Sequence, residues 1–141
     1  MTEDFTKIGA CNVVGSFDGV REALKTVNKL LEDIVAIEQM AAIELCMAET
    51  LNNIVEHGYK EKAGGRINIQ VERSNAVVCF SVSDTGHPNL VMSEQALPDA
   101  SFDPDAMADG GYGFSLMQTI ASRLDYRRVD GVNVTTIWCA L

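Results

Sequence analysis

The chain has 141 residues, 47% of them apolar, which is enough material for the core of one ordinary domain. Twenty acidic against eleven basic residues give a net charge of −9, which disfavours direct binding to nucleic acid phosphates. No uninterrupted apolar run of about 18 residues occurs, so we expect a cytoplasmic protein that does not span or anchor in a membrane.

The first half of the chain predicts one strand followed by two helices. Residues 7–14 have the composition of a strand, and Ser16 and Asp18 each offer an N-cap for a helix over roughly 18–35. A second helix is predicted over roughly 37–58, where a glycine ends it.

A hairpin and a long insert follow these helices. Apolar residues alternate with polar ones in residues 66–72 and again in 76–84, as in two paired strands with one buried face. The insert, residues 87–110, has no clear periodicity, and an insert of this length is commonly a lid or a disordered segment.

The end of the chain predicts a helix and a second hairpin. The helix covers about 113–123, and strands over 124–130 and 132–141 are joined at Asp130 and Gly131, a dipeptide typical of tight hairpin turns. This order of elements predicts an α+β fold, a two-layer sandwich with one mostly antiparallel sheet and helices packed on one face.

The second predicted helix carries a polar stripe opposite its apolar face. Glu49 and Asn53 are four residues apart and lie on one edge of the helix, with His57 one turn later. Asparagine is a mediocre helix former, so the pair Asn52 and Asn53 indicates that an amide oxygen has a role there. Amide oxygens beside carboxylates suit Mg²⁺, although a solvated helix edge has the same appearance. The apolar face consists of Ile43, Met47, Leu51 and Ile54.

Two glycine-containing segments follow the stripe. Asp84 and Gly86 form a D-x-G turn, in which the carboxylate can accept a hydrogen bond from a base and the glycine lets a ring approach the backbone. Alone, this turn is equally an ordinary end to a strand. Gly110, Gly111 and Gly113 precede a predicted helix, whose N-terminus offers free N–H groups to phosphate.

The combination of E-x-x-x-N, D-x-G and G-x-G in this order resembles the N, G1 and G2 boxes of the GHKL ATPase superfamily. The N-x-x-x-H-G-Y sequence and the short chain are similar to the anti-sigma-factor serine/threonine kinases of bacterial partner-switching systems. The resemblance covers roughly residues 15–141. It implies a single histidine-kinase-like ATPase domain over 1–141 with the Bergerat fold, a mostly antiparallel mixed sheet and a lid at about 87–112.

The resemblance also implies roles for individual residues. Asn53 matches the magnesium-binding asparagine, Glu49 matches the general base toward a substrate hydroxyl, and Asp84 matches the acid that holds the adenine amine. His57 matches a position to which we assign no role. Further nucleotide contacts are implied beside the base and the phosphates, for Gly86, Gly111, Gly113 and Thr136. At Thr136 the alignment leaves a slip of one position or more open.

The implied function is that of an ATP- and Mg²⁺-dependent protein serine kinase. It would phosphorylate a serine of an antagonist protein and sequester a sigma factor or a similar regulator, commonly as a homodimer. One departure concerns the charge of the lid, because no Lys or Arg occurs from His87 to Ser122 and Tyr112 lies inside the G-x-G. A γ-phosphate clamp is therefore not visible, and the alternative is a nucleotide-dependent protein-binding module without significant kinase activity.

Overall fold

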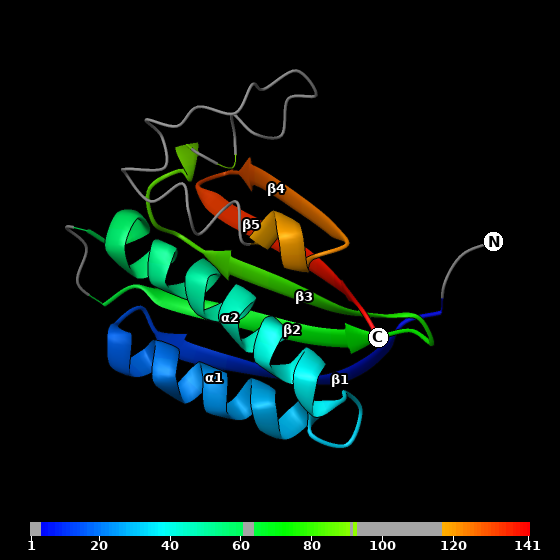
Figure 1. Cartoon of the computed structure of the whole chain (residues 1–141). Helices are drawn as coiled ribbons and strands as arrows, with labels where there is room; N and C mark the ends of the chain where they lie inside the picture. The colour runs from blue at the N-terminus through cyan, green and yellow to red at the C-terminus, as the bar shows by residue number, and fades with distance from the viewer. Residues whose placement is uncertain (1–3, 61–63, 91, 93–116) are drawn as a thin grey trace.

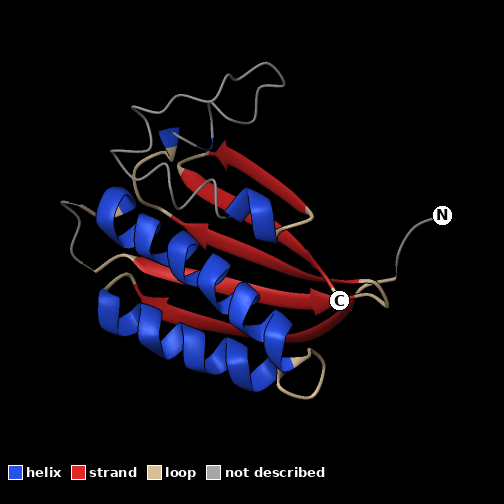
Figure 2. Ribbon diagram, viewed as in Figure 1, coloured by secondary structure: helices blue, strands red, loops and turns tan. Residues whose placement is uncertain are grey.

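The computed structural model describes residues 4–60, 64–90, 92 and 117–141. Within these residues, five strands form one sheet and two long helices cover it, which confirms the α+β sandwich (Figure 2). The strands are β1 (Thr6–Val14), β2 (Arg66–Arg73), β3 (Val77–Asp84), β4 (Arg123–Val129) and β5 (Val132–Ala140). The helical elements are α1 (Phe17–Leu31), α2 (Ile37–Asn53) and η1 (Ile54–Gly58), a π-helical turn that continues α2.

The strands lie in the order β1-β2-β3-β5-β4, and each neighbouring pair in the described part of the sheet is antiparallel. The mixed character expected from the resemblance is therefore not found in these strands. Both α1 and α2 pack on the same face of the sheet, with α1 over the β1 side and α2 beside it over the centre (Figure 1). In the portion of the chain that the structure describes, no helix is long and apolar enough to cross a membrane.

The helix ends differ from the predicted ones for local reasons. Ser16 caps α1, because its Oγ accepts a hydrogen bond from the N–H of Gly19 at 3.1 Å, whereas Asp18 lies inside the first turn. The same helix ends at Leu31, earlier than expected, where the Leu31 carbonyl accepts from the N–H groups of Ile34 and Val35. The last turn of the second helix widens into η1 before Tyr59 ends it.

The C-terminal hairpin has the predicted turn. Asp130 and Gly131 have φ angles of 52° and 79°, the left-handed conformation that such a two-residue turn requires. The preceding helix was predicted to reach residue 123, but the described helical residues are 117–120 and β4 begins at Arg123. There the Arg123 guanidinium lies over the Trp138 ring of β5, 4.7 Å from its centre, a contact that favours an extended chain.

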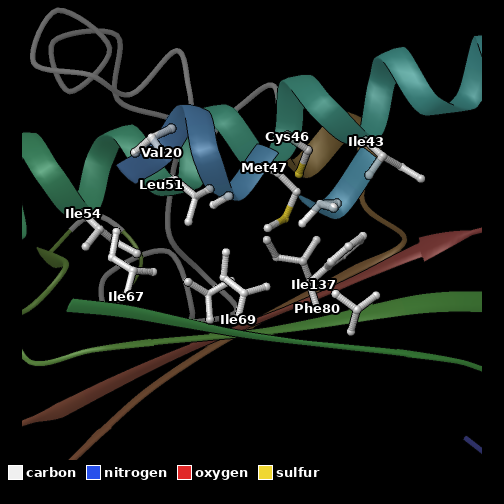
Figure 3. Close-up of a cluster of buried hydrophobic side chains, with 14 of the residues drawn as sticks. Val20, Ile43, Cys46, Met47, Leu51, Ile54, Ile67, Ile69, Phe80 and Ile137 are labelled. Atoms are coloured by element: carbon white, nitrogen blue, oxygen red, sulfur yellow. The ribbon is translucent and has the colours of Figure 1, made fainter. Parts of the chain in front are cut away.

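The core lies between the two helices and the sheet. The apolar face predicted for the second helix is confirmed, since Ile43, Met47, Leu51 and Ile54 are all buried. Figure 3 shows these side chains pointing down toward Ile67, Ile69, Phe80 and Ile137 of the strands. Because side chains alternate along a strand, the same pattern places Asp84, Asn133 and Thr135 on the helix-facing side of the sheet. The strands thus bring polar groups to one end of an otherwise apolar layer.

Candidate functional site

A cavity of about 290 Å³ opens between the C-terminal end of α2 and the sheet. Its helix wall comes from α2 and η1, and its sheet wall from the ends of β3, β4 and β5. The residues after β3 close a third side. The described lining residues are Thr50, Asn53, Ile54, His57, Gly58, Asp84, His87, Pro88, Asn89, Leu90, Met92, Met117, Tyr126, Asn133 and Thr135. Apolar walls with a few convergent polar groups are typical of small-molecule sites.

Asp84 is the buried acid at the sheet end of this cavity. Its Oδ1 accepts hydrogen bonds from the backbone N–H of Gly86 and from Nδ2 of Asn133, both at 2.9 Å. Within the described residues, the hydrogen bonds to this carboxylate all go to Oδ1. The second oxygen, Oδ2, is therefore available to a ligand.

The pKa of Asp84 reflects two opposing influences. Burial raises the pKa above its ordinary value of 3.8, and this is the largest effect. The hydrogen bonds from Asn133 and Gly86 and the positive charge of Arg128 lower it, but they do not cancel the effect of burial. A buried acid with a perturbed pKa that lines a cavity is typical of functional sites.

The turn after Asp84 is fixed against η1 by close backbone contact. A Cβ on Gly86 would lie 2.5 Å from the carbonyl oxygen of Gly58, so no other residue fits at position 86 without movement. The N–H of His87 donates to that carbonyl at 2.8 Å, and the N–H of Thr85 donates to the Tyr59 hydroxyl at 2.9 Å. The sequence interpretation gave Gly86 a role beside a ligand ring, whereas the structure shows first a role in packing.

Three polar residues of the last hairpin complete the sheet end, and the sequence interpretation missed all three. Asn133 donates to Asp84, and the Tyr126 hydroxyl and Nη1 of Arg128 donate to Oδ1 of Asn133 at 2.6 and 2.8 Å. Asn133 lies directly opposite Asp84 in the pairing of β3 with β5. The available signal was an asparagine inside a strand, where asparagine is otherwise disfavoured.

The helix end of the cavity is formed by the predicted polar stripe. Asn53, the last residue of α2, and His57 of η1 both line the cavity. Glu49 lies one turn before Asn53, is half-buried, and is not among the lining residues. In the described part of the molecule, the side chains of Asn53 and Glu49 make no hydrogen bond, so both remain available to a ligand or a partner.

Residues 16–138 match the family described as the histidine kinase-like ATPase domain. The chain belongs to this family. The matched range contains α1, α2, η1 and all the described residues that line the cavity.

Two curated relatives are similar to this chain in sequence, and one solved structure is similar to it in fold. Serine/threonine-protein kinase BtrW of Bordetella bronchiseptica is 30% identical over 98 residues, 67% of this chain and 66% of that protein. An anti-sigma F factor of Clostridium botulinum is 27% identical over 88 residues, 62% of this chain and 61% of that protein. The matches therefore span just under two thirds of these relatives. The SiaB-SiaC complex from Pseudomonas aeruginosa shares the fold, with a TM-score of 0.64 and 15% identity over 96% of this chain and 91% of that chain.

The residues of this histidine kinase-like ATPase domain fit a metal-bound nucleotide. At the sheet end, the buried Asp84 offers one free carboxylate oxygen, as an amino group of a base requires. Apolar side chains such as Ile54 and Met117 line the walls where a flat ring would lie. At the helix end, Asn53 offers an uncommitted amide oxygen, a ligand that suits Mg²⁺.

The remaining predicted nucleotide contacts are Gly111, Gly113 and Thr136. Gly111 and Gly113 lie outside the described residues. Thr136 lies on the face of the sheet opposite the helices, whereas Thr135 is buried and lines the cavity. Thr136 therefore faces away from the cavity and Thr135 lies at the position expected for it, because a slip of one residue along a strand exchanges its two faces.

Three arginines of the sheet, which could in principle supply positive charge to a phosphate, do not line the cavity. Arg66 bonds the side chain and carbonyl of Asn12, and Arg123 stacks on Trp138, both on the open face of the sheet. Arg128 is near the sheet end, but its Nη1 already donates to the carbonyl of Gly86. Among the described residues that line the cavity there is no Lys or Arg.

Proposed function

We propose that this chain binds ATP with Mg²⁺ in the cavity and transfers the γ-phosphate to a serine of an antagonist protein. We also propose that it sequesters a sigma factor or a similar regulator in the cytoplasm. Membership in the histidine kinase-like ATPase family and similarity to proteins named serine/threonine-protein kinase and anti-sigma F factor support this proposal.

The observation that carries the proposal is that Asp84 and Asn53 line one cavity from opposite walls. They lie 31 positions apart in the sequence, on β3 and at the end of α2. An acceptor for a base amine and a ligand for a metal-bound phosphate are the two groups that an ATP site needs at its two ends. An ordinary solvated helix edge would not place Asn53 on a cavity with a buried acid.

The proposed reaction assigns one step to each residue. Asp84 accepts a hydrogen bond from the adenine amine and so orients the nucleotide. Asn53 would hold Mg²⁺, which neutralises charge on the phosphates when it is bound. Glu49 takes the proton from the serine hydroxyl while that oxygen attacks the γ-phosphorus and the bond to ADP breaks.

A second candidate function is a nucleotide-dependent binding module that transfers phosphate slowly or not at all. The absence of Lys and Arg among the described residues that line the cavity favours it, because phosphoryl transfer needs positive charge around the moving phosphate. In that case ATP would change the affinity for a partner protein without forming phosphoserine.

We also propose that the protein forms a homodimer through β1 and α1. β1 lies at the edge of the described sheet, so its outer side pairs with no described strand. Val14 and Phe17, where this strand meets α1, are 46% and 53% exposed. An unpaired edge beside exposed apolar side chains suits association with a second copy.

A single-turnover assay with ATP, Mg²⁺ and candidate antagonist proteins tests the proposed kinase. Phosphoserine found by mass spectrometry supports the kinase. Nucleotide-dependent partner binding without phosphoserine supports the binding module instead. If ATP with Mg²⁺ gives no thermal shift, both functions are wrong, since a ligand that binds only the native state raises its stability.

A further inference from the structure

The side chain of Asn133 is fixed in one orientation by its neighbours. Its Oδ1 accepts from the Tyr126 hydroxyl at 2.6 Å and from Nη1 of Arg128 at 2.8 Å. A guanidinium can only donate, so the end of the amide that faces Arg128 must be the oxygen. The NH₂ end of the amide therefore points toward Asp84.

The NH₂ end occupies one oxygen of Asp84 and fixes the turn that follows it. Nδ2 lies 2.9 Å from Oδ1 of Asp84, 3.2 Å from the carbonyl oxygen of Gly86 and 3.1 Å from that of His87. The N–H of Gly86 donates to the same Oδ1 at 2.9 Å. Two protein donors thus occupy Oδ1, and Oδ2 alone remains for a ligand.

We propose that Asn133, oriented by Tyr126 and Arg128, is a positioning residue that sets nucleobase specificity by keeping Asp84 a hydrogen-bond acceptor. The inference rests on the proposed function of ATP binding. An ionised Asp84 accepts from the exocyclic amine of adenine and repels the carbonyl oxygen that guanine carries at the equivalent position. A protonated carboxyl could instead donate to that carbonyl, and the preference for adenine would fall.

The protonation of Asp84 depends on the same contacts. Burial raises its pKa, and the Asn133 hydrogen bond, the Gly86 N–H and the charge of Arg128 lower it. Loss of Asn133 or Arg128 therefore raises the pKa further. Affinity for ATP is full above this pKa and falls as the pH drops through it, so these variants lose affinity at a higher pH than the wild type.

Other titratable groups share the cavity with Asp84. His57 of η1, His87 after β3 and the Tyr126 hydroxyl of β4 face it. Both histidines and the nucleotide are the same in the wild type, the variants and the control.

The test is calorimetric titration with ATP and with GTP over a mildly acidic to neutral pH series. The variants are Asn133→Ala and the double variant Tyr126→Phe with Arg128→Met, which leaves Asn133 in place. Arg127→Met is the matched control, because Arg127 is exposed and pairs with Val134 on the open face of the sheet. A ratio of two affinities on one protein does not change with the folded fraction, so a purely structural defect leaves the ratio intact.

We expect both variants to lose about tenfold in the preference for ATP over GTP, which corresponds to one hydrogen bond to a charged group. We also expect the pH at which half of the ATP affinity is lost to be higher in these variants than in the wild type. In Arg127→Met this pH should equal that of the wild type. Variants with the wild-type ratio and pH profile would overturn the role of Asn133 while leaving ATP binding intact. A wild type that binds no nucleotide would overturn both this inference and the proposed function.

Discussion

The two ends of the cavity differ in how completely the fold prepares them. At the sheet end, Asp84 accepts from the Gly86 N–H and from Asn133, and Asn133 is itself held by Tyr126 and Arg128. At the helix end, Asn53 and Glu49 make no side-chain hydrogen bond to the rest of the described chain. The sheet end is fixed by hydrogen bonds within the protein, whereas the polar side chains of the helix end are uncommitted in the described chain.

The largest expected effect concerns chemistry at the helix end. Glu49→Gln should lower the single-turnover rate of phosphoryl transfer by about 100- to 10,000-fold, the usual contribution of a general base. ATP affinity should stay nearly unchanged, because Glu49 does not line the cavity. Glu56→Gln, an exposed acid of η1, is the control. Loss of nucleotide binding in Glu49→Gln would contradict the assignment.

The next effect concerns binding at the sheet end. Asp84→Ala should lower ATP affinity by about 10- to 100-fold, since a hydrogen bond to a charged group is lost and the N–H of Gly86 loses its partner. Asp125→Ala is the control, because it removes a carboxylate beside Thr136 on the face of the sheet away from the cavity. This variant should bind ATP as tightly as the wild type. Equal losses in both variants, measured by calorimetry, would show a general effect of charge.

A smaller effect on the free energy of unfolding should distinguish two glycines that are in contact, Gly86 and Gly58. Gly86→Ala should lower the free energy of unfolding by about 1–3 kcal/mol, because its Cβ would meet backbone atoms of Gly58. Gly58→Ala should be tolerated, since its nearest neighbour would be a methyl group of Ile54 at 3.6 Å. Urea unfolding of both variants measures the difference. Equal destabilisation would argue against the close contact between η1 and the turn.

The smallest effect distinguishes neighbouring threonines of β5. Thr135→Val should weaken ATP binding by a few-fold, as expected for loss of one neutral hydrogen bond of about 0.5–1.5 kcal/mol. Thr136→Val should have no effect, because Thr136 lies on the open face of the sheet. A loss confined to Thr136→Val would restore the original sequence prediction.

These differences show which features the sequence could supply. The layers, the hairpin turn at Asp130 and Gly131 and the buried helix face follow from local patterns that the structure confirms. The placement of Asn53 and Asp84 on one cavity agrees with the motifs that named them. The role of Asn133 was out of reach, because it depends on the register that pairs β3 with β5. A register cannot be fixed to one residue from alternation alone. Thr136 was named from the resemblance, whose alignment left a slip of one position open.

The start of β4 is a second case in which tertiary contacts decide. Residues 121–123 fit the end of a helix by composition, but β4 begins where Arg123 stacks on Trp138 and Ser122 bonds the Trp138 carbonyl at 2.8 Å. Partners 15 and 16 positions away in the sequence are invisible to a local pattern. Helix propensity is weak enough for such contacts to override it.

The central claim is that the cavity holds ATP with Mg²⁺, and calorimetry with and without Mg²⁺ tests it most directly. The proteins are the wild type, Asn53→Ala and the matched variant Asn52→Ala, whose asparagine does not line the cavity. We expect Mg²⁺ to strengthen ATP binding by the wild type and by Asn52→Ala, but not by Asn53→Ala. If Asn53→Ala binds ATP with Mg²⁺ as tightly as the wild type, the claim is wrong.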